Sequence, residues 1–296
     1  MRASARVVRL TALAALALPA ISLCWAEPAR RSPATRLAPG SPGTLAHAIA
    51  SYHPRHATPR RVEEGVLPAA AAAARCPVDM ADVEHRFCVD IYEGSLDEIA
   101  PEGTASAHSP YASPDEQHMY IARSVAGVVP QAYVSGAQAL AACSAAGKRL
   151  CQPVEWRQAC GGTVGYVYPY GPRHVPGRCN DRGRPPMLLL HPPAPAERGG
   201  PRWQGWNMDD LNDPEANRLE GTVAPTGAYS GCVSDIGVHD MVGNLHEWTA
   251  DPNGTFQGGY YLDTAQNGEG CAYRTAAHHF AYHDYSTGFR CCRDPE

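Results

Sequence analysis

The feature that most constrains the fold of this chain is its cysteine content, with 11 cysteines among 296 residues. One of them is Cys24, and the other ten extend from Cys76 to the adjacent pair Cys291 and Cys292. An even set of this kind, in an oxidising compartment, predicts disulfides. Ten cysteines allow many pairings, so their spacing does not determine the connectivity. The adjacent pair at the C-terminus favours two separate bridges over a redox switch.

The N-terminal residues predict export. Basic residues precede an apolar run from Leu10 to Leu23, and Ala26 offers a small residue for cleavage. This pattern indicates a secretory signal peptide over residues 1–26, and the run is shorter than the roughly 20 apolar residues of a membrane-spanning helix. We therefore expect a secreted or periplasmic protein without a transmembrane segment. A lipoprotein anchored through Cys24 is less favoured, because Leu23 stands where such signals usually have a small residue.

Charge and composition divide the rest of the chain. Residues 27–75 are rich in Pro, Ala and Arg, which predicts a disordered linker. All but three of the 30 Asp and Glu residues follow it, so the ordered domain predicted over residues 76–296 is acidic. An acidic surface repels phosphate backbones and favours bound cations. We expect a protein or small-molecule partner and no nucleic acid.

Strand and helix signals are sparse. Phe87, Val89 and Ile91 alternate with other residues as in a strand. Ser135 can cap a helix, which Gly147 is placed to end.

The apolar face of this first helix is expected to include Leu140 and Ala141, and Lys148 suits its C-terminal dipole. Pro153 suits the first turn of a second short helix that ends at Gly161 and Gly162. The segment from 168 to 205 is expected to be a long irregular loop.

Two groups of residues could hold metal ions. The stretch around Asp240, Gly243, Asn244 and Glu247 offers the oxygen ligands that calcium prefers, although a solvated acidic turn has the same composition. It is not a helical zinc motif, because position 250 is Ala where a second His is needed.

The C-terminal tail holds a second group, His278, His279, His283 and Asp284. Such side chains could bind zinc, copper or iron, but structural or surface histidines are the favoured interpretation.

Five blocks in chain order carry a family resemblance: "AYVSGAQALAACSAAGKRLCQPVEWRQACGG", "YPYG", "GVHDMVGNLHEWTAD", "GGYYL" and "STGFRC". Together they resemble the formylglycine-generating enzyme family, also called sulfatase-modifying factor domains, over residues 76–296. The resemblance implies an irregular α+β fold with little regular secondary structure, a variant of the C-type-lectin-like fold, stabilised by disulfides and calcium. It also implies a disulfide between Cys143 and Cys291. The partner of Cys160 stays open between Cys179 and Cys271.

The resemblance implies two structural calcium sites. The first would use Asp240, Gly243, Leu245 and Glu247, with the glycine and leucine acting through their carbonyls. The second, whose alignment crosses a long loop, would use Asn180, Asp181, Asn217 and Leu219.

The chemistry of the family is oxygen-dependent oxidation of a substrate cysteine to formylglycine, with copper(I) held by two cysteines after a "GGS" turn. Here the turn reads "GGYYLD", so Tyr260 replaces the serine and Asp263 replaces the first cysteine, while Cys271 lies near the second position. One thiolate and one carboxylate suit copper(I) poorly. We therefore identify no catalytic residue and expect copper to be absent from this vacated site.

The resulting prediction is a secreted, calcium-stabilised binding module without catalysis, a pseudoenzyme of the family. The alternative is an oxygen-dependent oxidoreductase, of the formylglycine-generating type or with divergent metal-dependent chemistry.

Overall fold

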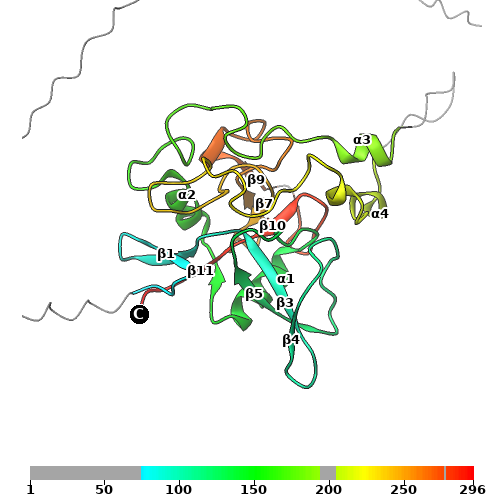
Figure 1. Ribbon diagram of the computed structural model, residues 1–296, viewed down its shortest axis with the longest axis horizontal. Helices are drawn as coiled ribbons and strands as arrows, with labels where there is room; N and C mark the ends of the chain where they lie inside the picture. The colour runs from blue at the N-terminus through cyan, green and yellow to red at the C-terminus, as the bar shows by residue number, and fades with distance from the viewer. Residues whose placement is uncertain (1–74, 194–204, 277) are drawn as a thin grey trace, which may run out of the picture. The chain divides into compact units, whose positions relative to one another are not determined.

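A computed structural model describes residues 75–193, 205–276 and 278–296. The predicted signal peptide and, apart from Arg75, the predicted linker lie outside the described residues. Within those residues, no helix is long and apolar enough to cross a membrane. Short strands and helices alternate with long connections (Figure 1), so the prediction of an irregular, mixed fold is confirmed.

Three small sheets organise the described residues. The first has the order β1-β2-β11-β6 and the second the order β10-β7-β8-β9, in which β10 and β7 are parallel. The third sheet, β4-β3-β5, is antiparallel throughout. The strands of the first sheet are Met80–Val83 (β1), Phe87–Asp90 (β2), Arg149–Leu150 (β6) and Cys291–Arg293 (β11). Those of the second are His246–Trp248 (β7), Phe256–Gln257 (β8), Arg274–Thr275 (β9) and Thr287–Phe289 (β10). Those of the third are Gly94–Ile99 (β3), Ala105–Ala107 (β4) and Met119–Ser124 (β5).

The helices are short. They are Gly136–Ala145 (α1), Pro153–Gly161 (α2), Pro186–Leu190 (α3) and Met208–Leu211 (α4), with 3-10 turns at Ala216–Arg218 (η1) and Gly270–Ala272 (η2). The expectation of an irregular loop from 168 to 205 is therefore wrong for α3, where a proline starts the helix and Met187 is buried.

Local capping chemistry sets the ends of the two longer helices. Ser135 Oγ accepts a hydrogen bond from Gln138 N at 3.2 Å, and Gln138 Oε1 accepts one from Ser135 N at 2.8 Å, which forms a capping box. Pro153 begins α2, and Gly162 ends it with a positive φ of 64°. The predicted starts and ends of both helices are thus confirmed.

The predicted apolar face of α1 is wrong. Leu140 is 40% exposed and Ala141 is exposed, whereas Ala139, Ala142 and Cys143 are buried. This helix packs against β5 and β6, and Cys143 joins it to Cys291 of β11 through a disulfide. Small side chains on the buried face allow the backbone of α1 to lie close to these strands, so Ala139 and Ala142 face inward instead of Leu140.

Lys148 was expected to interact with the C-terminal dipole of the first helix, but its ammonium group binds two carboxylates instead. Its Nζ atom bonds to Asp79 Oδ2 at 2.7 Å and Asp90 Oδ1 at 2.6 Å, and its side chain is only 7% exposed. Asp90 comes from β2, where all four residues are buried instead of alternating. The first sheet is therefore covered on both faces, and this ion pair neutralises a buried carboxylate.

Five disulfides crosslink the described residues. The pairs are Cys76–Cys88, Cys143–Cys291, Cys151–Cys292, Cys160–Cys271 and Cys179–Cys232. The adjacent cysteines at the C-terminus thus form two separate bridges, and Cys160 pairs with Cys271 rather than Cys179. Cys76 thus connects the start of the described domain to β2, and Cys291 connects its end to α1.

Candidate functional site

The loop that follows β8 begins with a glycine pair whose geometry permits no side chain. Gly258 and Gly259 have φ values of 86° and 72°. A Cβ atom on Gly259 would lie 2.2 Å from Asp263 O. Tyr260 and Asp263 then exchange two backbone hydrogen bonds of 2.9 and 3.0 Å. The loop therefore turns back sharply and holds Tyr260 and Asp263 side by side.

A polar cavity of about 250 Å³ lies beside this turn. Its lining comes from β7, β8, β9, the loop between β8 and β9, and the segment before β10: His246, Phe256, Tyr260, Asp263, Gln266, Asn267, Tyr273, Thr275, His278, Asp284, Tyr285 and Ser286. Gln266 and Asn267 are exposed, so the cavity opens to solvent on their side. We take this cavity as the candidate functional site.

His246 lines the buried end of the cavity. Its side chain comes from β7, the residue is 6% exposed, and its Nδ1 atom has no hydrogen-bond partner among the described residues. Its ring centroid lies 4.6 Å from that of Phe256 and 4.8 Å from that of Tyr260. Burial lowers the pKa of His246 to about 3, so the imidazole is neutral at physiological pH.

Asp263 holds its own loop together. Its Oδ1 atom accepts hydrogen bonds from Ala265 N at 3.0 Å and Gln266 N at 2.9 Å. Its Oδ2 atom accepts one from Tyr273 Oη at 2.8 Å. The carboxylate at the first copper-cysteine position is thus bound by protein donors while it still lines the cavity.

Cys271 carries no free thiol. It is bonded to Cys160 of α2 and is 6% exposed. Its backbone N donates to Val167 O at 2.8 Å. The cysteine that the resemblance places nearest to copper is therefore a structural crosslink in this structure.

The histidines of the tail do not converge. His278 lines the cavity and stacks on Tyr282 with ring centroids 4.1 Å apart. His283 Nδ1 is 2.7 Å from Asn212 Oδ1, and His279 Nδ1 accepts from Ala281 N at 3.2 Å. In the described parts of the chain, no group of three or more His, Cys, Asp or Glu side chains is arranged to hold a metal ion.

The residues predicted for the first calcium site surround a buried arginine. Glu247 accepts two hydrogen bonds from Arg290, at 2.6 and 2.7 Å, and one from Trp156 Nε1 at 2.6 Å. Asp240 is 4% exposed, and its Oδ2 accepts from Gly227 N at 2.6 Å. Burial raises the pKa of Asp240 to about 6, and the Glu247 carboxylate contributes to this rise.

A third carboxylate, which the sequence did not single out, belongs to this cluster. Glu93 is 1% exposed and accepts from Asn244 Nδ2 at 2.5 Å and Leu245 N at 3.2 Å. Burial, together with Asp240 and Glu247, raises the pKa of Glu93 well above its usual value. The backbone of Gly243 has a φ of 81°. Three buried carboxylates thus lie near one guanidinium group, which makes hydrogen bonds to Glu247 alone among them.

The residues of the second predicted calcium site lie in two neighbouring networks. Asn180 Nδ2 donates to Thr222 O at 2.9 Å, and Thr222 Oγ1 donates to Leu219 O at 2.6 Å. Asn217 Nδ2 donates to Tyr285 O at 2.6 Å.

Asp181 is turned to other partners. Its Oδ1 accepts from Gly177 N at 2.9 Å, and its Oδ2 pairs with His174. The Asp181 side chain therefore stabilises the loop that precedes it. The second calcium site remains a prediction.

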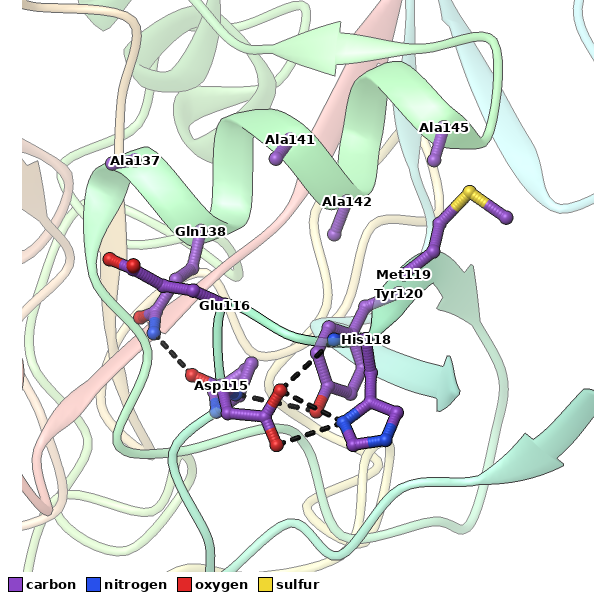
Figure 2. A pocket seen from close by; sticks show the side chains of 11 residues that line it. Asp115, Glu116, His118, Met119, Tyr120, Ala137, Gln138, Ala141, Ala142 and Ala145 are labelled. Atoms are coloured by element: carbon purple, nitrogen blue, oxygen red, sulfur yellow. Dashed lines mark hydrogen bonds and ion pairs between the residues drawn. The ribbon is translucent and has the colours of Figure 1, made fainter. Parts of the chain in front are cut away.

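A larger cavity of about 440 Å³ lies between α1 and the start of β5. Figure 2 shows the alanines of α1 along one side, with Met119 and Tyr120 opposite them and Asp115 and His118 hydrogen-bonded together. Its lining combines alanine, methionine and proline with Asp115, Glu116 and His118, and Asp115 and His118 are paired with each other. It offers little for chemistry, so we assign the candidate site to the smaller polar cavity.

Most residues of the cavity wall were not predicted from the sequence. His246 was considered only as a zinc ligand, and Phe256, Tyr273 and Tyr285 were not singled out. The signal available was their position inside or next to the blocks "GNLHEW" and "GGYYL". Recognising them required the pairing of β7 with β8 and of β8 with β9, which no local pattern contains.

The structure defines a class of protein: a disulfide-crosslinked α+β domain with a polar cavity beside a glycine turn. Residues 103–295 match the model of the sulfatase-modifying factor enzyme 1-like domain family, which is more than half of the chain. The chain therefore belongs to this family, and the resemblance stated from the sequence is confirmed.

Two curated relatives carry the name "Inactive C-alpha-formylglycine-generating enzyme 2". The protein from Bos taurus is 34% identical over 122 residues, which cover 41% of this chain and 32% of the relative. The protein from Mus musculus is 30% identical over 145 residues, which cover 46% of this chain and 39% of the relative. The matches thus span less than half of the length of these relatives.

Solved structures of two Major Tropism Determinant variants are similar at a lower level. The I1 variant has a TM-score of 0.43 and 15% identity, with 75% of this chain and 54% of that chain covered. The P3c variant has a TM-score of 0.42 and 16% identity with the same coverage. We draw no conclusion from a likeness at this level.

Proposed function

We propose that this chain is a secreted, non-catalytic binding module of the sulfatase-modifying factor family. The observation that carries the proposal is the disulfide between Cys160 and Cys271, which leaves no free thiol in the described loop beside the cavity. Copper(I) favours soft thiolate ligands, and Asp263 supplies a hard carboxylate already bound by three protein donors. The names of the two relatives support the same interpretation.

The five disulfides support secretion, because such bridges form and persist in oxidising compartments. A C-type-lectin-like variant is the fold that we propose, on the basis of family membership and the small sheets joined by long connections.

We further propose structural calcium beside Arg290, held by two carboxylates and two backbone carbonyls and not by a group of three acidic side chains. Glu93, Asp240 and Glu247 are buried near the single guanidinium group of Arg290, and burial together with their mutual repulsion raises the pKa of Glu93 and Asp240. With all three ionised, the cluster would carry an excess of buried negative charge. A divalent cation would neutralise this excess, and carboxylates and carbonyls are the ligands that calcium prefers. Asp240, Gly243, Leu245 and Glu247 would hold the ion, and the second site would use Asn180, Asp181, Asn217 and Leu219.

The purified protein is expected to leave a peptide with the sulfatase cysteine motif unchanged, even with copper(I) and oxygen supplied. The readout is mass spectrometry of the peptide, which detects loss of the cysteine and formation of an aldehyde. An active member of the family serves as the positive control. Conversion of the peptide by this chain, above the level of copper alone, would show that the proposed function is wrong.

Calcium is expected to raise the melting temperature of the wild-type protein relative to chelator. At about 100 times the dissociation constant, binding adds about 2.7 kcal/mol, which corresponds to roughly 5–10 °C for a domain of this size. Asp240→Asn removes one charged ligand and should abolish most of the shift. The control is Asp97→Asn, on an exposed surface ion pair with Arg123, which should keep it. Identical melting of the wild type in calcium and in chelator contradicts the calcium proposal.

A further inference from the structure

Aromatic rings form much of the wall of the polar cavity. Phe256, Tyr260, Tyr273 and Tyr285 line it together with the ring of His246. The rings contact one another, with centroids 4.6 to 5.5 Å from that of His246 for the first three. Ring faces attract cations through their quadrupole, so this wall suits a positively charged group.

The charges of the cavity have one sign. Asp263 and Asp284 are the carboxylates among its lining residues, and none of the described lining residues is Lys or Arg. Asp284 is 7% exposed, and its Oδ1 accepts from Ser286 N at 2.8 Å and Ser286 Oγ at 2.7 Å. The protein itself thus holds both carboxylates in place at the wall.

The Oδ2 atom of each carboxylate can accept a further hydrogen bond. Asp263 Oδ2 accepts from Tyr273 Oη at 2.8 Å, and Asp284 Oδ2 accepts from Tyr282 Oη at 2.5 Å. A carboxylate oxygen has two lone pairs. A ligand with several N–H donors can therefore bind these oxygens without displacing the tyrosines.

The buried end of the cavity has an unpaired polar atom. His246 is more than nine-tenths buried, and its Nδ1 has no hydrogen-bond partner among the described residues. Buried polar atoms in folded proteins almost always have a partner. The nitrogen itself is closed off from solvent, so the groups that a ligand can reach are the rings and the two carboxylates.

The volume of the cavity limits the size of a ligand. Sites for drug-sized ligands measure about 300–1,000 Å³, and this cavity measures about 250 Å³. It accommodates one side chain or a molecule of similar size, not an oligosaccharide or a folded segment.

From this combination of aromatic wall, two carboxylates and small volume we infer that the cavity binds an alkylammonium group, carried either by a free amine or by a lysine side chain of a partner protein. The inference rests on the proposed function, because it names the ligand class of a site that binds without oxidising. The acidic groups recognise the charge, and the rings cover the methylene groups beside it.

Calorimetric titration of the full chain tests this inference with three probes. They are N-acetyl-lysine N-methylamide, butylammonium chloride and the neutral analogue N-acetyl-norleucine N-methylamide. The lysine derivative is expected to bind and the norleucine derivative is not. Equal binding of butylammonium identifies a free amine as sufficient, whereas binding of the lysine derivative alone identifies a peptide source.

Variants assign the binding to the cavity. Asp284→Asn and Asp263→Asn are each expected to lower the affinity for the lysine derivative by about tenfold, since each removes a charged hydrogen-bond acceptor. Asp115→Asn removes a carboxylate from the larger cavity and should change the affinity less than about twofold. Tyr260→Leu, which removes one ring of the wall, should bind the lysine derivative more weakly. Melting curves verify that each variant is folded.

Two results would overturn the inference: equal affinity for the charged and neutral probes, or wild-type affinity in folded Asp263→Asn and Asp284→Asn. A separate titration with glucose is the control for a sugar ligand, and binding of glucose but not of the lysine derivative would also overturn the inference. None of these results bears on peptide oxidation, so failure here is distinct from failure of the proposed function.

Discussion

Replacing Arg290 with methionine is expected to destabilise the protein by about 3 to 5 kcal/mol, because it leaves buried carboxylates without their counter-charge. Arg290 is fully buried and makes two hydrogen bonds to Glu247. Its remaining donors reach Asp90 O at 2.9 Å, Ile91 O at 3.3 Å and His239 O at 2.8 Å. All five N–H groups of the guanidinium are thus used to join β2 to β7.

The expected loss is a large share of the 5–15 kcal/mol that stabilises a typical domain, and it corresponds to a melting temperature lower by roughly 6–20 °C. Arg290→Lys should recover little, because an ammonium group has three donors and cannot span both oxygens of Glu247 in the same plane. Thermal and urea melts measure the difference.

Arg218→Met is the matched control. Arg218 forms an exposed ion pair with Glu215, and such pairs contribute about 0–1 kcal/mol. Adding Glu247→Gln to Arg290→Met should recover part of the loss, because it removes one of the carboxylates that lack a partner. Equal stability of Arg290→Met and Arg218→Met would show that the buried cluster does not depend on this arginine.

The elements that the sequence predicted are those whose signals are local. Ser135 with Gln138, and Pro153 with Gly162, set the helix ends through bonds and torsions within a few residues. The buried face of α1 could not be predicted in this way. Leu140 is more apolar than Ala139, yet the disulfide of Cys143 and the packing on β5 turn the alanine inward.

Of the three residues that the sequence placed in the vacated site, Tyr260 and Asp263 line the cavity and Cys271 does not. The glycine turn and Asp263 were identified from the resemblance, because their order along the chain is that of the family. His246 and Asp284 join Asp263 only because β7 pairs with both β8 and β10. Contacts between residues so far apart in the chain depend on tertiary packing, which a single sequence does not encode in any short pattern.

Removing both disulfides of the adjacent C-terminal cysteines is expected to cost more than twice the cost of removing either. Cys143–Cys291 and Cys151–Cys292 close loops with sequence separations of 148 and 141 residues. With one bridge intact, the other closes a path of only about ten residues, and the chain-entropy relation gives it about 3 kcal/mol. When both are absent the larger loop opens as well. The intact bridge Cys160–Cys271 shortens this loop to a path of roughly 40 residues, so the total rises to about 7 kcal/mol.

Pairwise alanine variants test this nested arrangement in urea melts. Each pair variant should fold, and the quadruple variant should be largely unfolded at 25 °C, since its loss approaches the whole stability of a typical domain. The bridge Cys76–Cys88 lies outside both loops, so its removal combined with that of Cys151–Cys292 should be additive. If the quadruple variant loses no more than the sum of the two pair variants, the two bridges act independently and the nested-loop account is wrong.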